Sequence, residues 1–318
     1  MAFEWYMAGV AAEYLHGYWI TPSARDYVPV HGMHLSEESL ATLWLYFGDT
    51  GNRIPHPHPT SGHEAFRHWY CAIHMATSDY RLPEAFVNIA RDRVQPYVFK
   101  EFFDKNPMNP AEYGFINKNY GLTSMVSESG NPPPDMTRWK LQWVPVEAES
   151  EPSVFFMKHP MPNEDGGWKN WEGASPYEQV YQHEGTLISM YKIPGTDTHP
   201  FIDGPLDTTL FELIINRDNW WFLHAGKMLF ALYAENGLRL TGEERIAYDH
   251  FGTTALTGVI RSDGNKNILI VETALQEDFE GADAREELDH FAEVVLNNPV
   301  CPILFTSGAS YATNAKEL

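Results

Sequence analysis

Hydrophobic residues recur at helical spacing over roughly the first 105 residues, and they alternate with polar ones from about 113 to 273. Four helices are predicted in the first part: 3–18, 36–47, 61–77 and one that begins at Pro83. The third opens with Ser61 and Glu64 at the spacing of a capping box. The fourth starts on a proline, which the first helical position favours. Pro96 should kink or split this last helix.

The second part reads as a series of short strands separated by turn-like segments rich in Gly, Pro, Asn and Asp. Nine strands are predicted: 113–127, 138–146, 153–158, 178–193, 208–216, 219–224, 227–233, 253–261 and 267–273. Strands this short and this regularly spaced favour an antiparallel sandwich over a parallel sheet. A helix at 283–297 and a last strand at 302–306 should follow.

The predicted fold class is therefore α+β, with a helical N-terminal layer packed on a large antiparallel β-sandwich. The boundary candidate is the segment Asn106-Pro-Met-Asn-Pro110, which gives a helical domain at 1–105 and a sandwich domain at 113–318. Ligand sites favour such junctions between layers. We therefore expect the functional cleft between the helices and the sandwich.

Two stretches of the sandwich allow a local prediction. Residues 177–191 read as one strand with Tyr181 and His183 on one face, and Gly185 in its middle suggests a bulge or a close backbone approach. The apolar runs 220–224 and 227–233 flank Ala225-Gly226 and should form a buried hairpin.

Charge and cysteine content narrow the possible partners. The formal charge of −21 excludes a nucleic-acid partner and an anionic membrane surface, because both demand a basic footprint. Two cysteines cannot build a disulfide framework or a Cys-based zinc site. No signal peptide and no membrane-spanning run is expected, and the compartment stays open between the cytoplasm and a processed exported form.

Candidate chemistry is concentrated on the third predicted helix. His63 and Arg67 are four residues apart on one side of that helix, with Tyr70 nearby. A histidine can act as a general base, an arginine can pair with a carboxylate, and a phenol can donate a proton. An ordinary solvated helix face explains the same pattern equally well.

The sandwich offers a second set of candidates. Tyr181 and His183 could face the helical row across a cleft, and Tyr120 follows the boundary directly. His183 is as readily structural as functional. His56 and His58 could ligate a metal, but without a third ligand the metal question stays open. The sequence contains no nucleotide-binding glycine loop, nucleophile elbow or zinc-protease motif.

Four runs of the β part resemble the C-terminal portion of the heparinase II/III-like polysaccharide lyases. They are Phe115-Ile-Asn-Lys-Asn-Tyr-Gly-Leu-Thr-Ser124, Gln179-Val-Tyr-Gln-His-Glu-Gly-Thr-Leu-Ile188, Asn219-Trp-Trp-Phe-Leu-His-Ala-Gly226 and Arg261-Ser-Asp-Gly-Asn-Lys-Asn267. The resemblance implies a partial α/α toroid packed on the sandwich, and β-elimination on a uronic-acid glycan. It implies a Tyr or His base, a group that neutralises the carboxylate and a Tyr acid. The candidates for these roles are His63, Arg67, Tyr70, Tyr120, Tyr181 and His183.

Two features depart from that family. About 105 residues hold too few helices for a full toroid, so the chain is a shortened relative, or the missing helices lie upstream or on a partner. The strong negative charge is also unusual for an enzyme that degrades a polyanion.

The predicted function is a polysaccharide lyase without a cofactor that acts on an acidic polysaccharide or a small molecule. Its expected protein partner is a second copy of the chain in a homo-oligomer or a protein that supplies the missing helices. Two alternatives stay open. One is a non-catalytic glycan-binding or scaffold protein, and the other is a related fold used for acid/base isomerisation or cyclisation of a small organic substrate.

Overall fold

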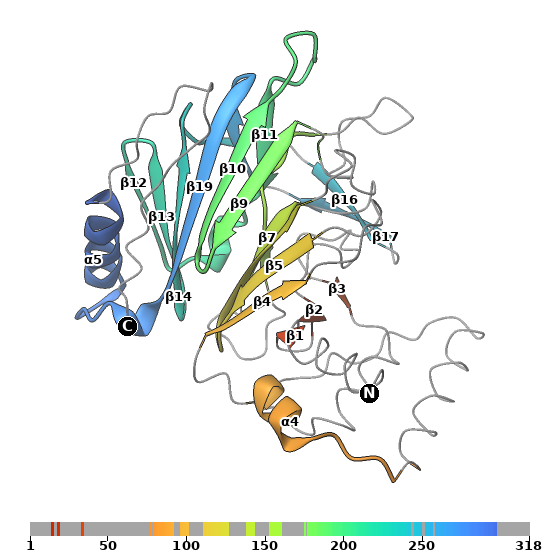
Figure 1. Ribbon diagram of the computed structural model, residues 1–318. Coiled ribbons are helices and arrows are strands. Elements are labelled where there is room, and N and C mark those ends of the chain that lie inside the picture. The colour runs from red at the N-terminus through yellow and green to blue at the C-terminus, as the bar shows by residue number, and fades with distance from the viewer. Residues whose placement is uncertain are drawn as a thin grey trace.

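The computed structural model of the chain is built almost entirely from antiparallel sheets (Figure 1). It describes residues 77, 79–91, 96–101, 111–126, 138–143, 153–160, 175, 177–242, 245–249, 252–256 and 258–297. Three two-residue strands are also described near the N-terminus: β1 (Tyr14–Leu15), β2 (Tyr18–Trp19) and β3 (Met33–His34). All statements below concern these residues.

The larger of the two main sheets has six strands, and each neighbouring pair is antiparallel. Their order is β12 (Leu213–Arg217), β13 (Trp220–Ala225), β14 (Met228–Ala234), β19 (Lys266–Leu275), β10 (Thr186–Lys192) and β9 (Glu178–His183). The hairpin β13–β14 turns at Gly226, whose φ of 64° lies in the left-handed region that glycine adopts without strain.

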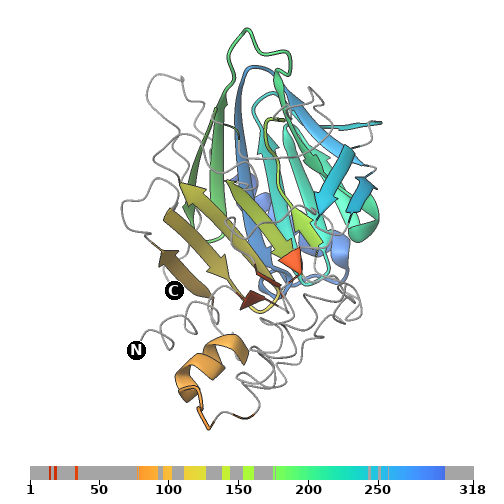
Figure 2. The same cartoon turned by 90° about the vertical axis from the view of Figure 1, so that its right-hand side faces the viewer.

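The second main sheet has five strands in sequence order: β4 (Tyr97–Glu101), β5 (Ala111–Ile116), β6 (Tyr120–Val126), β7 (Trp139–Trp143) and β8 (Ser153–Phe155). It packs against the six-stranded sheet through one shared core (Figure 2). Trp139, Leu141 and Trp143 of β7 alternate into this core, where the Trp143 ring meets Phe230 of β14. The arrangement is a β-sandwich.

Smaller sheets complete the sandwich. One has the order β11 (Phe201–Pro205), β18 (Val259–Asp263) and β15 (Arg239–Thr241), and the other pairs β16 (Arg245–Asp249) with β17 (Gly252–Leu256). Two short 3-10 helices lie at Thr208–Leu210 and Gln276–Asp278. β11 also forms a bridge to the segment after β8, because Lys158 and Asp203 exchange both backbone hydrogen bonds at 2.9 Å.

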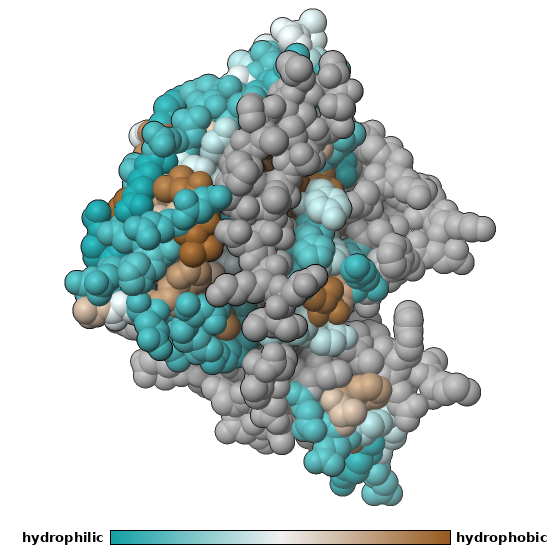
Figure 3. Space-filling view, turned by 60° about the vertical axis from the view of Figure 1, so that its left-hand side comes forward, coloured by the Kyte–Doolittle hydropathy of each residue, from teal (hydrophilic) through white to brown (hydrophobic). Residues whose placement is uncertain are grey.

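Helix α5 (Ala284–Leu296) covers the outer face of the six-stranded sheet (Figure 1). It begins where the Asp283 carboxylate accepts hydrogen bonds from the backbone N–H groups of Arg285 and Glu286. Its buried stripe follows helical spacing and includes Leu288, Phe291, Ala292 and Val295. The face of the molecule that carries α5 is mainly hydrophilic around a smaller hydrophobic patch (Figure 3).

The structure confirms the predicted antiparallel β-sandwich, whereas it does not establish the predicted helical layer. Of the N-terminal helices, only the fourth lies in the described part, as α4 (Glu84–Arg91) directly after Pro83. The predicted helix at 3–18 is wrong where it overlaps β1 and β2. Residues 36–47 and most of 61–77 lie outside the described residues, as does the predicted strand 302–306.

Two further expectations need correction. The fourth helix does not resume after Pro96, because Tyr97–Glu101 is strand β4, hydrogen-bonded to β5. The five-stranded sheet therefore crosses the predicted domain boundary. Residues 177–191 are not one bulged strand but the hairpin β9–β10, which turns at Glu184 and Gly185. The buried hairpin β13–β14 and helix α5 are confirmed.

Candidate functional site

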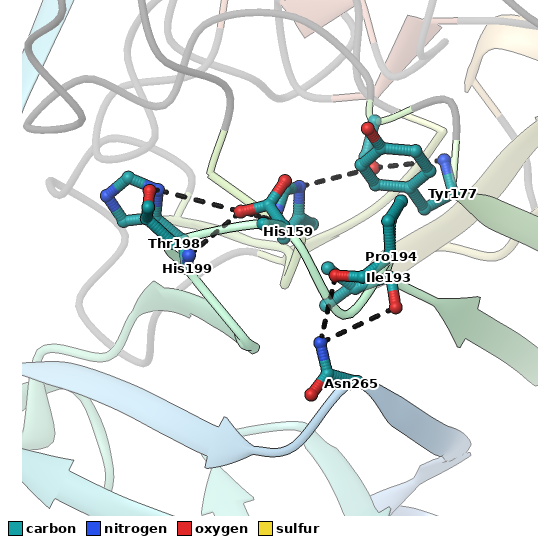
Figure 4. Close-up of polar contacts among 9 residues, drawn as sticks. His159, Tyr177, Ile193, Pro194, Thr198, His199 and Asn265 are labelled. Carbon is teal, nitrogen blue, oxygen red and sulfur yellow. Dashed lines mark hydrogen bonds and ion pairs between the residues drawn. The ribbon is translucent and has the colours of Figure 1, made fainter.

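The densest group of proton-transfer side chains gathers where three separate segments meet beside the sandwich core (Figure 4). His159 follows β8 and its bridge to β11. Ser175 and Tyr177 come just before β9, and Asp197 and His199 lie on the loop between β10 and β11. We call these five residues the histidine cluster.

One carboxylate links the two imidazoles of the cluster. Asp197 Oδ1 lies 3.5 Å from His159 Nε2 and 3.7 Å from His199 Nδ1, which are ion-pair distances. The backbone N–H of His199 donates to the same oxygen at 2.8 Å. The same oxygen is therefore within ion-pair range of both rings, although Thr198 Oγ1 lies closer to His199 Nδ1, at 3.1 Å. Two imidazoles beside one carboxylate can hold and pass a proton.

The other side of His159 faces a hydroxyl and a phenol. Its Nδ1 lies 3.4 Å from Ser175 Oγ, and that oxygen accepts the backbone N–H of Tyr177 at 3.1 Å. The rings of His159 and Tyr177 meet edge to face, with centroids 5.4 Å apart. His159 is thus enclosed between Asp197 and Tyr177, and it fixes the position of both.

The loop that carries Asp197 and His199 is tied down at its start and end. The Asn265 amide donates to the carbonyls of Pro194 at 3.1 Å and Ile193 at 3.5 Å (Figure 4). The Ile193 N–H donates to the carbonyl of Asn265 at 2.7 Å. The Gly264 N–H donates to the carbonyl of Pro200 at 2.6 Å. These bonds hold the loop against the β18–β19 turn, which limits how far the cluster can spread.

The cluster contains the buried His159 and a partly accessible rim formed by Asp197 and His199. The side chain of His159 is 1% exposed and that of Asp197 18%, while that of His199 is 16% exposed. Burial lowers the pKa of His159, although the nearby Asp197 carboxylate opposes this effect. His159 is therefore neutral at pH 7, and the rim residues can meet a ligand.

A buried carboxyl group lies next to the cluster, on β9. The Glu178 carboxylate accepts a hydrogen bond from Ser189 Oγ at 2.7 Å, and burial raises the pKa of this carboxyl group. The Tyr191 hydroxyl also lies beside it and donates to the carbonyl of Met157 at 3.0 Å. The Arg138 Nε–H donates a hydrogen bond to the carbonyl of Ser175, at 3.3 Å.

No metal ligand set is present in the part of the chain that the structure describes, since no three His, Cys, Asp or Glu side chains there are spaced to hold an ion. Among the same residues, no helix is both long and apolar enough to cross a bilayer.

The structure describes three of the six sequence-predicted site residues: Tyr120, Tyr181 and His183. His63, Arg67 and Tyr70 lie outside the described residues, as do His56 and His58. Tyr181 and His183 are both exposed on the same face of β9, as alternation predicts, and Tyr181 is 64% exposed. His183 is six residues from Tyr177 along this strand, which corresponds to about 20 Å. The histidine cluster and His183 are therefore at opposite ends of β9.

Tyr120 occupies a third place, inside the core between the two main sheets. It is 2% exposed, and its side chain forms hydrogen bonds with Thr273 of β19 and with Asn117. Burial raises its pKa well above the ordinary value for tyrosine. This environment joins the two sheets, and Thr273 Oγ1 also donates to the carbonyl of Gly185, in the β9–β10 turn that follows His183.

Sequence reasoning missed every residue of the histidine cluster. Asp197 and His199 lie between β10, which was predicted as part of one longer strand, and β11, which was not predicted. Two local signals were present: His159 and His199 are each followed by proline at the end of a strand or loop. Nothing local shows that these two loops meet, because the bridge between Lys158 and Asp203 creates that proximity.

No protein-family model matches the chain, and no curated protein is significantly similar to it in sequence. The resemblance to heparinase II/III-like lyases therefore stays a prediction.

Proposed function

We propose that the protein is a polysaccharide lyase that cleaves a uronate-containing glycan by β-elimination at the histidine cluster. The observation that carries the proposal is the Asp197 carboxylate, which lies within ion-pair distance of two imidazoles next to a half-buried phenol. Elimination needs a base and an acid that reach one sugar unit, and few other groups among the described residues offer both.

The exposures suggest how the roles are divided. His199, on the rim, takes the proton alpha to the uronate carboxylate, and the C–O bond to the neighbouring sugar then breaks. A carbon–carbon double bond forms in the uronate ring, and the Tyr177 hydroxyl protonates the departing oxygen. Asp197 stabilises the imidazolium that forms on His199.

His159 is a positioning residue in this scheme, because its side chain is 1% exposed and cannot reach a polymer. Its neutral ring lies between Asp197 and Tyr177 and keeps the base and the acid apart at a fixed spacing. This role predicts that substitutions of His159 alter the geometry of the site and leave its chemical groups in place.

The test is the absorbance of the unsaturated uronate at about 232 nm, since elimination creates a conjugated double bond. Alginate, pectate, hyaluronan, chondroitin and heparan sulfate form a suitable panel. His199→Ala and Tyr177→Phe should each lower kcat by about 10²–10⁴-fold, because each removes a positioned base or acid.

The matched control is His290→Ala, which removes an exposed histidine of α5 far from the cluster in sequence and should leave turnover unchanged. His183→Ala separates this proposal from the sequence-based assignment. Loss of turnover in His183→Ala with full activity in His199→Ala would move the site to the other end of β9. No product from any glycan would contradict lyase activity.

A specific observation favours one alternative, a glycan-binding protein without turnover. Tyr181 is 64% exposed and lies near the half-buried Tyr113, whose hydroxyl accepts the Glu184 N–H at 2.8 Å. Exposed tyrosines offer a flat apolar surface with a polar tip, which suits a sugar ring. Calorimetric binding that Tyr181→Ala abolishes, with no product at about 232 nm, would support this alternative.

A further inference from the structure

Two exposed lysines lie side by side on the six-stranded sheet, on the face that points away from the five-stranded sheet. Lys192 ends β10 and Lys266 begins β19, and they are direct partners in the antiparallel ladder between these strands. Tyr191 points into the core, so alternation turns Lys192 outward. Side chains of direct partners share one face, with Cβ atoms about 4.5–5.5 Å apart. We call these two residues the lysine pair.

The charges around the lysine pair make it unusual in this chain. Like charges directly opposite one another destabilise a sheet, and the chain has only 22 Lys and Arg residues against 43 Asp and Glu. The exposed Lys118 pairs with Glu277, whereas Lys192 forms no ion pair in the part of the chain that the structure describes. The acidic Glu235 lies on the other side of β19 from Lys192, since its N–H donates to the carbonyl of Ile268 at 3.0 Å. The Lys192 ammonium can therefore meet an anionic ligand.

Lys192 is also a neighbour of Tyr177, the acid in the proposed elimination. The backbone N–H of Lys192 donates to the carbonyl of Tyr177 at 3.0 Å, which extends the pairing of β9 and β10 by one residue. Strand partners have Cα atoms about 4.5–5.5 Å apart. On its other side, Lys192 directly precedes the loop that carries Asp197 and His199. The lysine pair therefore borders the histidine cluster.

The same face continues along β9 as a row of exposed side chains. Gln179, Tyr181 and His183 alternate with inward-pointing residues, and all three are exposed. Gln179 is the direct partner of Met190, which lies two residues from Lys192, so this row and the lysine pair share one face. Figure 1 shows β9 beside β10 at the edge of the sheet. Along the strand, Tyr181 is about 13 Å from Tyr177.

We propose that this face binds the glycan that the histidine cluster cleaves, with Lys192 at the carboxylate of the sugar next to the reacting one and Tyr181 against a more distant sugar ring. Hydrogen bonds from an ammonium to a carboxylate are short and strong. The Gln179 amide between them can donate to and accept from sugar hydroxyls, and an exposed tyrosine offers a flat apolar surface. The inference rests on the proposed lyase function and narrows its substrate to polymers of consecutive uronates.

The first test removes the charge of Lys192. Lys192→Met keeps most of the aliphatic side chain, and it should bind oligogalacturonate about tenfold more weakly, because a hydrogen bond to a charged group contributes roughly that much. Calorimetry is done in the His199→Ala background, so that no ligand is consumed. The carboxyl-reduced oligosaccharide should bind equally with and without Lys192→Met. In turnover by the otherwise unchanged protein, pectate and alginate should be preferred to hyaluronan, whose uronates alternate with a neutral sugar.

Lys227→Met is the matched control. Lys227 is an exposed lysine in the β13–β14 turn, and its carbonyl accepts the Gln276 N–H at 3.0 Å. It therefore lies at the far end of β19, about 30 Å from Lys266, and its substitution should leave the affinity unchanged. A second variant, Tyr181→Ala, tests the distant contact. Its loss of affinity should grow with the length of the ligand from a disaccharide to an octasaccharide, because only a long glycan reaches from the cluster to Tyr181.

The outcomes separate this inference from the lyase proposal. The inference is overturned if Lys192→Met leaves the affinity for oligogalacturonate unchanged, or if Lys227→Met lowers it as much. Turnover with unchanged Kd and KM in Lys192→Met would overturn the binding face and leave the lyase proposal standing. Binding that Lys192→Met weakens, with no unsaturated product from the wild type, would overturn the lyase proposal alone. A wild type that binds no uronate oligosaccharide would overturn both.

Discussion

The buried ion pair between Asp203 and Arg261 should control the stability of the sandwich and the geometry of the histidine cluster together. Arg261 Nη2 donates to Asp203 Oδ2 at 2.9 Å, and the side chains are 7% and 0% exposed. The guanidinium also lies 3.8 Å from the centre of the Phe201 ring. Asp203 bridges Lys158 next to His159, and its strand β11 continues the loop that carries His199.

Asp203→Ala removes the carboxylate and leaves a guanidinium at 7% exposure without this partner. Breaking a buried pair from one side typically costs about 3–5 kcal/mol. For a domain of this size that corresponds to a fall of roughly 10 °C in melting temperature. Urea denaturation measures the free energy of unfolding directly, and a thermal melt checks it.

The double variant Asp203→Leu with Arg261→Met is the internal control. Removing both charges avoids an uncompensated charge, so the double variant should be more stable than Asp203→Ala. If Asp203→Ala lowers the free energy of unfolding by less than about 1 kcal/mol, the reasoning is refuted, because a solvent-exposed ion pair contributes no more than that to stability. A double variant less stable than the single one would do the same.

Three further outcomes are expected. Burial raises the pKa of Glu178 above 4.5, so its contribution to stability is present below that pH and is lost as the pH rises. Glu178→Gln should therefore gain melting temperature relative to wild type as the pH rises, and a constant difference across a pH series of thermal melts would contradict this. Burial lowers the pKa of His159 below 6.5, so its contribution is present above that pH and is lost as the pH falls. His159→Gln should lose less stability than wild type between about pH 7 and pH 5 in urea titrations, and equal losses would argue against a buried neutral ring. Glu287→Ala removes carboxylate oxygens that lie 2.9 Å from His224 Nε2 and 2.6 Å from the Gln276 amide nitrogen. This variant should lower the free energy of unfolding by about 2 kcal/mol. An unchanged denaturation midpoint would show that these bonds do not hold α5 on the sheet.

The sequence pattern predicts those elements whose turn, cap and buried face are determined by residues close together in the chain. The hairpin β13–β14 combines two apolar runs with Ala225-Gly226, so its turn is visible in the sequence. Helix α5 has its cap at Asp283 and its buried stripe at helical spacing. Both were predicted within one or two residues because side chains near in sequence determine them.

Non-local packing explains the errors. Tyr97–Glu101 is a strand because β5 supplies its hydrogen bonds, and its apolar residues also suit a helix. The hairpin β9–β10 was hidden because Glu184, at a φ of 47°, adopts a left-handed turn conformation that non-glycine residues seldom take. The histidine cluster joins three loops through the bridge to β11, and no spacing in the sequence encodes that contact.

The chemistry of bond cleavage is the central claim, and one measurement addresses it most directly. Wild-type protein is incubated with the uronate glycan panel, and the masses of the products are determined by mass spectrometry. Elimination adds no water, so the account predicts products whose new non-reducing end is unsaturated and lighter by one water than a saturated end. Products with saturated non-reducing ends would show hydrolysis and contradict the account, and an absence of new ends on every glycan would contradict it equally.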